Sequence, residues 1–383
     1  MEHAFGHGES FLVGVEEELL IVDRQTHRLA PAAAVLLESL SAPVGSAGYE
    51  APAAEIELRS APCAQAADAA EQLAQLRGRA PTADLTLMGA GVHPTARWGD
   101  VALVDIERYA QVGETMRGLI RRTPECALHV HVSMPDPESA IRAYNGLREH
   151  LPVLIALGAN SPWWFGADSG LASARYALVR SYPRRGVPNR LRDFEHYVET
   201  IDAVTAAGEL PDYTWVWWDV RLQPKLGTVE VRELDAQSRV SDVAGIGALV
   251  QGLACHEAGS GAGARASRGA GARASSGARG TLPTEAIAES CFRACRDGLD
   301  ASIFAGGAVR PAREVARATI ELARPYARDL GSEPALDGLR DVLERGGGAE
   351  RQRAAYRRGG VEAMLEGLAQ ETMAPLGRDR GAN

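Results

Sequence analysis

The sequence is short of cysteine, of net positive charge and of long apolar runs, and each shortage excludes a class of protein. Its five cysteines form no CxxC pair and are odd in number, which argues against a disulfide framework and favours a reduced, cytoplasmic setting. A net charge of −9 argues against a general affinity for nucleic acid. No apolar run reaches the roughly 20 residues that cross a bilayer. The start, Met1-Glu2-His3, leads into no basic stretch followed by an apolar core, so we expect neither a membrane span nor a secretory signal.

The familiar nucleotide-binding motifs are missing as well. The sequence contains neither a GxxxxGK(S/T) loop nor a GxGxxG run that follows a strand pattern. A nucleotide would therefore have to be held by another surface, such as the face of a sheet.

What is present is a first half that mixes strand and helix patterns and a second half that becomes helical. Strand-like runs cover residues 11–22, 53–59, 85–92, 127–132, 215–222 and 228–234. Helices are predicted over 64–77, 137–157, 285–299, 311–322, 334–343 and 361–373, and Asp136 can cap the second of them. Residues 160–188 are rich in Gly, Ser, Pro and Arg and are interpreted as a long structured loop. This order indicates an α+β protein with a mostly antiparallel sheet, in one catalytic domain over residues 1–383 with a helical C-terminal tail.

One segment stands apart by composition. Residues 258–280 contain only Ala, Gly, Ser and Arg, so they cannot bury a core and are predicted to form a mobile, positively charged loop. An insertion without a role in function is the interpretation that we favour, because surface loops tolerate insertions.

Charged and imidazole side chains recur at i and i+2 in the strand-like runs. In a strand, such residues lie on one face. The pairs are Glu16 and Glu18, Glu55 and Glu57 (with Arg59 beyond), His129 and His131, Asp219 and Arg221, and Glu230 and Arg232. A single pair is typical of a solvent-facing strand, but five pairs made almost only of carboxylates, imidazoles and guanidiniums are not.

If these strands are neighbours, one face of the sheet collects acids, imidazoles and arginines. Unpaired buried charge is unfavourable, so such a face requires metal ions and an anionic ligand. Carboxylates with an occasional imidazole suit Mg²⁺ or Mn²⁺, and guanidiniums beside hard cations are suited to phosphate. The pattern therefore predicts metal–nucleotide chemistry.

Several motifs resemble one known family, the carboxylate–amine ligases of the YbdK type, also called glutamate–cysteine ligase type 2. The resemblance runs in the family's order over roughly residues 10 to 300. Its motifs are Gly14-Val15-Glu16-Glu17-Glu18, Gly91-Val92-His93-Pro94, His129-Val130-His131-Val132, Ala159-Asn160-Ser161-Pro162, Ala172-Ser173-Ala174-Arg175, Trp218-Asp219-Val220-Arg221, Gly227-Thr228-Val229-Glu230-Val231-Arg232 and Ala294-Cys295-Arg296-Asp297-Gly298-Leu299.

The resemblance implies a glutamine-synthetase-like fold, in which an antiparallel sheet forms a funnel with helices on its outer face. It also implies that ATP, with Mg²⁺ or Mn²⁺, activates a carboxylate as an acyl phosphate that an amine then attacks. Glutamate and cysteine are the substrates that the family's name suggests. A homo-oligomer is compatible with this interpretation.

Roles are carried over residue by residue. The expected metal ligands are Glu16, Glu18, Glu57, His129, His131 and Glu230, with the choice between the two histidines left open. The expected phosphate or substrate groups are Arg175, Arg221 and Arg232, and those expected to bind the nucleotide are Arg221, Arg232 and Lys225. Glu50, seven residues before Glu57, is a further acidic candidate.

Two other functions stay open at this point. A metal-dependent hydrolase or amidase could use the same face without ATP, although the arginines speak against it. A non-catalytic protein that binds a nucleotide or an amino acid is a further alternative. The tryptophans at 163–164, 215 and 217–218 are interpreted as core residues rather than as a substrate pocket.

Overall fold

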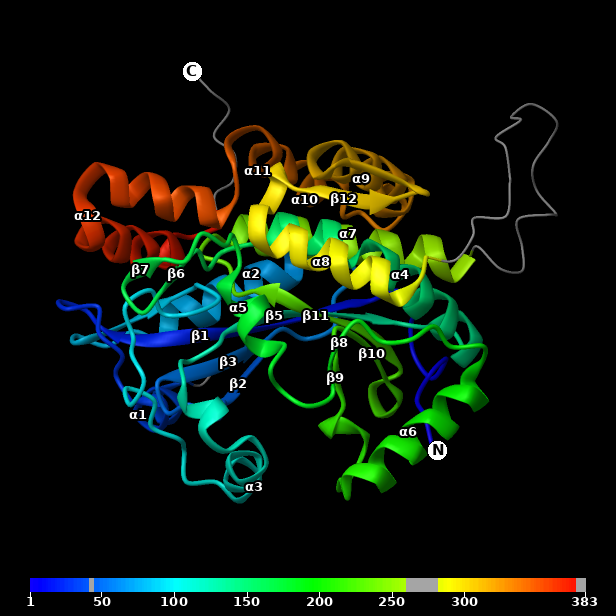
Figure 1. Cartoon of the computed structure of the whole chain (residues 1–383), viewed down its shortest axis with the longest axis horizontal. Helices are drawn as coiled ribbons and strands as arrows, with labels where there is room; N and C mark the ends of the chain where they lie inside the picture. Colours follow the sequence, from blue (N-terminus) through cyan, green and yellow to red (C-terminus); the bar gives the residue numbers. More distant parts are fainter. Residues whose placement is uncertain (41–44, 260–281, 377–383) are drawn as a thin grey trace.

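A computed structural model describes residues 1–40, 45–259 and 282–376. Figure 1 shows a sheet at the middle of the molecule with layers of helices on one side of it. The predicted loop at 258–280 falls almost entirely outside the described residues. No helix in the described part of the chain combines the length and apolar character that crossing a membrane requires.

The central sheet has seven strands, and their order is β10-β11-β5-β1-β3-β2, with β4 also paired to β1. All of these pairs are antiparallel. The strands are β1 (Val13–Asp23), β2 (Ser46–Tyr49), β3 (Glu55–Arg59), β4 (Leu85–Met88), β5 (Ala127–Ser133), β10 (Val220–Gln223) and β11 (Thr228–Asp235). The predicted strand runs at 11–22 and 228–234 are therefore confirmed as β1 and β11.

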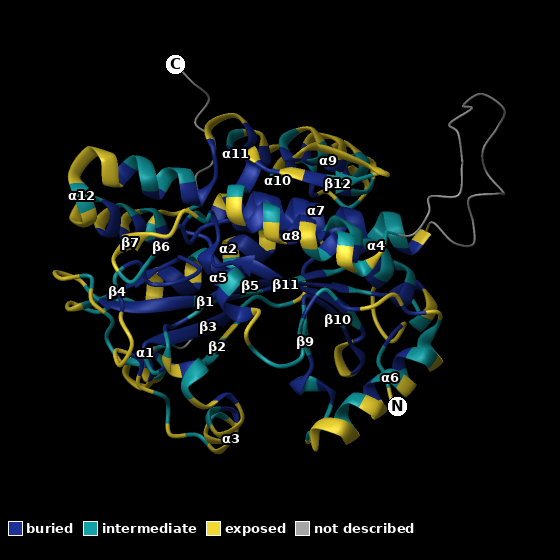
Figure 2. Cartoon of the chain, viewed as in Figure 1, coloured by how far each residue is buried: buried dark blue, intermediate teal, exposed yellow. Residues whose placement is uncertain are grey.

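Helices cover one face of this sheet in two layers. The inner layer is formed by α2 (Ala66–Arg79), α4 (Pro137–Gly158) and α7 (Val240–Gly259), which contact the strands directly. Asp136 caps α4 by accepting a hydrogen bond from the Ser139 amide at 2.7 Å, as predicted. Beyond them lie α8 (Thr284–Asp297), α9 (Ala312–Asp329), α10 (Glu333–Asp337) and α11 (Leu339–Arg345), while α12 (Gly348–Met373) extends to one side (Figure 1). Figure 2 shows the burial that results, with α7 almost wholly dark blue and much of the sheet dark blue as well.

The opposite face is covered only in part. Figure 1 places α3 and α6 on this side, at the lower edge of the view. Smaller elements complete the described chain: α1 (Ala33–Ser39), α3 (Glu107–Met116), α5 (Ala174–Val179), α6 (Phe194–Gly208), the strand pairs β6 (Trp163–Trp164) with β7 (Ala167–Asp168), β8 (Arg185–Gly186) with β9 (Trp217–Trp218) and β12 (Ser302–Ala305) with β13 (Ala308–Pro311), and the short 3₁₀ helices η1 (Arg117–Arg121), η2 (Tyr213–Trp215), η3 (Pro224–Leu226) and η4 (Gly298–Asp300).

Three sequence interpretations are wrong in detail. The run 215–222 is not one strand, because it is divided between η2, β9 and β10, and β9 pairs in parallel with β8 outside the central sheet. The segment 160–188 contains α5 in addition to loop. Neither α6 nor α7 was predicted. Helix α7 is buried along most of its length, and a helix that is apolar all round lacks the one-sided stripe that marks an amphipathic helix.

Candidate active site

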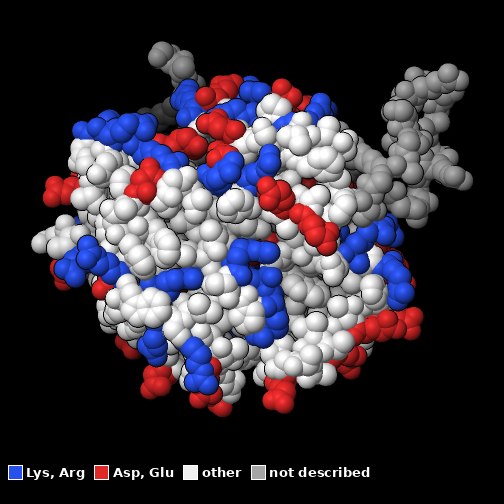
Figure 3. Space-filling view, viewed as in Figure 1, with Lys and Arg blue, Asp and Glu red and all other residues white. Residues whose placement is uncertain are grey.

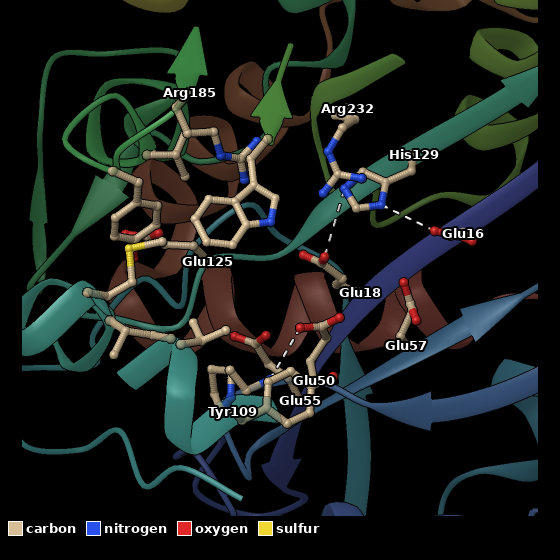
Figure 4. A pocket seen from close by; sticks show the side chains of 18 of the residues that line it. Glu16, Glu18, Glu50, Glu55, Glu57, Tyr109, Glu125, His129, Arg185 and Arg232 are labelled. Carbon is tan, nitrogen blue, oxygen red and sulfur yellow. Dashed lines mark hydrogen bonds and ion pairs between the residues drawn. The ribbon is translucent and has the colours of Figure 1, made fainter. Parts of the chain in front are cut away.

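A cavity of about 450 Å³ lies on the face of the sheet that the inner helices leave uncovered. Its walls come from β1, β3, β5, β10 and β11 and from the chain around α3, η1 and β8. Figure 4 shows acidic side chains, His129 and Arg232 pointing into this space from several strands. Over the face seen in Figure 3, acidic and basic side chains are interspersed, and basic ones gather near the middle.

The strand register brings the predicted polar pairs together. Glu16 of β1 lies opposite His129 of β5, and Glu18 lies opposite Glu57 of β3. On the other side of β5, Glu230 lies opposite His131 and also opposite Arg221 of β10. Four of the five pairs, those on β1, β3, β5 and β11, therefore share one face of the sheet, as the alternation predicted. Arg221 of the neighbouring strand β10 lies on the same face.

The fifth pair is divided. Arg221 lines the cavity, but Asp219 does not. Strand β10 begins only at Val220, and Asp219 is fully buried beside the hydroxyl of Tyr176. The prediction that Asp219 and Arg221 face the same site is wrong, because the strand pattern does not extend back to Asp219.

Two groups of side chains have ligand atoms close enough to hold a metal ion. One consists of Glu16, His129 and Glu230, and the other of Glu18, Glu57 and His129; within each, the ligand atoms lie within 4.8 Å of one another. Oxygen-rich sets with one imidazole suit Mg²⁺ or Mn²⁺.

His129 has the properties of a ligand. Burial, and then the charge of Arg232, lower its pKa, which favours the neutral imidazole that metals bind. Its Nε2 atom is buried and makes no hydrogen bond within the described structure. The Nε2 atom of His131 is likewise buried without a hydrogen bond, 3.6 Å from Glu16, and its Nδ1 atom lies 3.1 Å from Thr228 Oγ1, but His131 belongs to neither group. The geometry therefore favours His129 over His131 as a ligand.

The carboxylates of the first group are held ionised. Burial would raise the pKa of Glu16, but hydrogen bonds with His129 and His131 outweigh it and lower that pKa. Burial opposes ionisation of Glu230 too, yet Arg221 and Arg232 bring its pKa well below the usual range. Ionised carboxylates are the form that binds a divalent cation.

The predicted arginines separate into two sets. Arg221 and Arg232 line the cavity, and both bind Glu230, Arg221 through its Nε atom at 2.6 Å. Arg175 does not line the cavity: it is buried and donates to the Leu234 carbonyl at 3.3 Å. Lys225 does not line it either, because η3 turns its exposed side chain toward the ring of Tyr213, 5.7 Å away. The structure therefore does not bring Arg175 or Lys225 into the predicted site.

Other lining residues come from segments in which no pattern marked them. Arg108, Tyr109, Tyr182 and Arg185 line the cavity from segments outside the central sheet, and Glu125 precedes β5. They are brought to the site by long-range packing, for which a single sequence carries no local signal. Trp217, interpreted from the sequence as core, also lines the cavity and is only half-buried.

One end of the cavity is acidic. Burial, and then the charge of Glu18, raise the pKa of Glu50 to about 8, and burial with the same neighbour raises that of Glu55 well above its usual value. Both side chains line the cavity beside Tyr109 (Figure 4). Unlike Glu16 and Glu230, neither carboxylate lies within ion-pair distance of a described lysine, arginine or histidine, although Arg59 and Arg232 act on Glu50 from farther away.

A second cavity, of about 390 Å³, adjoins the first. Glu16 and Arg59 line both, and His131, Ser133 and Thr228 line the second alone. Its remaining wall is largely apolar or glycine, from the start of the chain and from Leu12 to Val15. The first metal-ligand group therefore lies where two cavities meet.

Comparisons with known proteins agree with this architecture. The sequence profile of glutamate-cysteine ligase family 2 (GCS2) matches residues 12–371, well beyond the range of the motifs noted in the sequence. A Rubrobacter xylanophilus protein with the provisional name glutamate–cysteine ligase 2-1 is 37% identical over 369 residues, which cover 93% of this chain and 94% of the relative. A Rhodospirillum rubrum protein with the provisional name glutamate–cysteine ligase 2 is 33% identical over 97% of this chain and 98% of its own length.

Two solved structures share the fold. Glutamate–cysteine ligase from Francisella tularensis, solved in complex with AMP, superposes with a TM-score of 0.69 at 12% identity, over 96% of this chain and 90% of its own. A bifunctional glutathione synthetase from Pasteurella multocida gives a TM-score of 0.64 at 14% identity, over 94% of this chain and 52% of its own. The predicted α+β, glutamine-synthetase-like fold class is confirmed.

Proposed function

The chain belongs to glutamate–cysteine ligase family 2, and from this premise we propose that it is an ATP-dependent ligase that joins the carboxylate of glutamate to an amine. Cysteine is the amine that the names of the relatives suggest. The observation that carries the proposal is the row of metal-ligand carboxylates and His129 beside Arg221 and Arg232, at the junction of two cavities.

The two cavities suit two ligands that must meet. ATP in one and glutamate in the other would bring the γ-phosphate and the substrate carboxylate to the shared wall at Glu16 and Arg59. The AMP complex of the Francisella tularensis enzyme supports a nucleotide in this fold.

Divalent cations would be held by Glu16, His129 and Glu230 and by Glu18, Glu57 and His129. Bound there, they would neutralise the charge of the triphosphate. Arg232 and Arg221 lie next to this position and would stabilise negative charge on the transferred phosphoryl group. Arg59, which reaches both cavities, would steady the same charge.

The reaction requires no nucleophile from the protein. An oxygen of the glutamate side-chain carboxylate attacks the γ-phosphorus, the bond to the β,γ-bridging oxygen breaks, and ADP leaves. The nitrogen of the amine then attacks the acyl carbon of the acyl phosphate. Inorganic phosphate departs, the amine nitrogen loses a proton, and an amide remains.

The test is phosphate release by the purified protein with ATP, Mg²⁺ and L-glutamate, against cysteine and a panel of other amines. Release that requires glutamate and an amine, stops with EDTA and is absent in Glu16→Gln is the expected result. Glu366→Gln, an exposed site on α12, is the matched control. Amide hydrolysis that needs metal but no ATP would instead favour a metal-dependent hydrolase.

A further inference from the structure

Arg185 reaches the first cavity from outside the central sheet. Its side chain is 11% exposed and lines the cavity, and Figure 4 shows it across the view from Glu50 and Glu55. Its Nη1 atom donates to Glu233 Oε1 at 2.6 Å, and its Nε atom is buried with no hydrogen-bond partner among the described residues. A guanidinium carries five N–H donors in a planar fork, so the bond to Glu233 leaves donors for a ligand.

The turn that carries Arg185 is strained. Arg184 adopts a φ of 59° and Gly186 a φ of 115°, and the first of these is unfavourable for a residue with a Cβ atom. The Arg184 guanidinium lies over the ring of Trp217, 4.9 Å from its centre, and Trp217 pairs with Arg185 between β8 and β9. Strain of this kind persists where the surrounding structure holds the backbone firmly, and it is typical of functional sites.

Two carboxyl groups lie behind Arg185. Glu233 of β11 is 1% exposed and Asp219, just before β10, is fully buried. The backbone amide of Asp219 donates to the Gly186 carbonyl at 3.1 Å, so Asp219 also borders the strained turn. Within the described residues, no N–H or hydroxyl group reaches Asp219 Oδ1 or Glu233 Oε2, although both atoms are buried.

A shared proton satisfies these two oxygens, because the two side chains lie within hydrogen-bonding reach of each other. Burial, and then the charge of Glu233, raise the pKa of Asp219 well above its usual value. Burial opposes the ionisation of Glu233, but Arg185 and then Arg175 lower its pKa. Asp219 is therefore the protonated donor, and Glu233 is the ionised acceptor that also pairs with Arg185.

No second carboxylate of the described protein uses Arg185. Glu125 lines the same cavity, but its partner is Arg122 at 2.7 Å. Arg185 also belongs to neither the metal-ligand groups nor the arginines that bind Glu230. A planar fork with free donors, set apart from the metal-ligand groups, suits a ligand carboxylate that takes no part in the reaction.

We propose that Asp219 and Glu233 are positioning residues that hold Arg185 in the first cavity, where its guanidinium binds a carboxylate of an amino-acid substrate. The inference rests on the proposed ligase function. A contact remote from the reacting atoms orients the substrate so that its reacting group meets the metal-ligand groups. The acid substrate and the amine acceptor both present such a carboxylate when they are amino acids, and analogues that lack it distinguish the two sources.

The first experiment compares turnover of each amino acid with that of its analogue. L-Isoglutamine has an amide in place of the α-carboxylate of glutamate, and cysteamine is cysteine without its carboxylate. In the wild type, kcat/KM for at least one amino acid should exceed that for its analogue by at least about tenfold, and Arg185→Gln should abolish this preference. Arg317→Gln, the same change at an exposed site on α9, is the matched control.

The preference that is lost identifies the source of the carboxylate. A lost preference for glutamate assigns it to the acid substrate, and a lost preference for cysteine assigns it to the acceptor. Preferences that Arg185→Gln leaves unchanged, or a rise in the KM for ATP alone, would overturn the proposal.

The second experiment tests positioning with a matched pair of variants at Asp219. Asp219→Asn keeps an N–H donor toward Glu233 and a carbonyl toward the Tyr176 hydroxyl, 3.5 Å from the native carboxyl group. Asp219→Leu has nearly the same size and no donor. The Asn variant should keep the preference, whereas the Leu variant should narrow it about tenfold through the KM of the carboxylate-bearing substrate, with the KM for ATP unchanged.

Glu233→Gln keeps the shape of that side chain without its charge, and it should narrow the preference in the same way. It serves as the second variant if Asp219→Leu does not fold. An Asn variant that behaves as Asp219→Leu does, or a full preference in Glu233→Gln, would overturn the positioning role.

Binding without turnover separates the possible failures. Each amino acid and its analogue are titrated calorimetrically into wild type and Arg185→Gln with Mg²⁺ and no nucleotide. Binding that depends on Arg185, together with no ATP turnover for any acid and amine, would overturn the ligase function and not the carboxylate site. A wild type that turns over ATP but neither binds nor uses either amino acid in preference to its analogue would overturn the carboxylate site and leave the ligase intact.

Discussion

Glu17 and its neighbours Glu16 and Glu18 are identical residues on one strand, but they lie on opposite faces of the sheet and have opposite surroundings. Glu17 faces the helices, is fully buried, and forms a two-point ion pair with Arg77 at 2.6 and 2.7 Å. Glu16 and Glu18 face the cavity, where their partners include weakly paired imidazole atoms. The charge of Glu17 is balanced by one close ion pair, whereas the arginine in ion-pair range of Glu16 is Arg59, 3.9 Å away. A charged residue therefore indicates a ligand site only where the fold leaves some of its hydrogen-bonding and ion-pairing positions unfilled.

The largest effect on catalysis should come from the face of the sheet that carries Glu16 and Glu18 and lines the cavity, called here the open face. Glu16→Gln removes a carboxylate from the first metal-ligand group without adding volume. We expect ligase kcat/KM to fall by about 10³-fold or more, about 4 kcal/mol in the activation barrier, while the melting temperature changes little because Glu16 is only half-buried. Steady-state phosphate release measures the loss of kcat/KM, and thermal unfolding measures the melting temperature. If Glu16→Gln stays active, or unfolds at a much lower temperature than the wild type, then Glu16 does not differ from Glu17 by serving catalysis rather than stability.

The covered face should respond in the opposite way. Glu17→Gln leaves the Arg77 guanidinium buried without its carboxylate, and breaking such a pair destabilises a protein by about 3–5 kcal/mol. Arg77 also donates to the carbonyls of Gln237, Ser238 and Thr372, so the damage should reach the junction of α2 with α7 and α12. Denaturant unfolding measures the loss, and kcat/KM of the folded fraction should stay near that of the wild type. The double variant Glu17→Met with Arg77→Leu should recover most of the stability, because it removes both charges together.

This contrast also marks what the sequence could predict. The period of two correctly predicted that Glu16 and Glu18 share a face, and that His129 and His131 do so on another strand. It could not show that Glu17 is balanced by Arg77, because the two are 60 residues apart and meet only through the packing of α2 on β1. A charged residue between apolar neighbours looks the same whether it has a distant partner or not.

The rest of the site depended on long-range structure in the same way. Tyr109 and Arg185 reach the cavity from elements outside the central sheet, so no periodicity marks them. Arg175 was assigned by motif, and the fold buries it behind the site instead. The missed helix α7 lies between the sheet and the outer helices, and its burial on all sides removes the amphipathic pattern by which a helix is recognised.

An intermediate effect, of opposite sign to that of Glu17→Gln, is expected at Glu50. Its pKa is about 8 in the folded protein against an ordinary value of 4.5, so the stability present below pH 4.5 is lost as the pH rises toward 8. Glu50→Gln cannot ionise and should escape this loss. With EDTA present, the melting temperature of the wild type should fall further between pH 6 and pH 9 than that of the variant, leaving the variant more stable at pH 9. Parallel curves for the two proteins would show that Glu50 has no uncompensated charge.

The smallest effect should come from Lys225, the only lysine of the chain. A lysine in a phosphate-using enzyme is a natural candidate for the nucleotide, but this one is exposed on η3 and lies over Tyr213, outside both cavities. Lys225→Ala should therefore change kcat/KM for ATP by less than about threefold, since an exposed cation contributes little. Arg221 provides the matched comparison, because it lines the first cavity and contacts Glu230, and Arg221→Lys keeps the charge while losing the planar fork. Loss of about 10²-fold in Arg221→Lys beside near-normal kinetics in Lys225→Ala would mean that position on the open face, and not charge alone, decides which cation serves the reaction. If the KM for ATP rises tenfold in Lys225→Ala, the nucleotide extends beyond the two cavities to the η3 turn. The expectation that Lys225 does not contact the nucleotide would then be wrong.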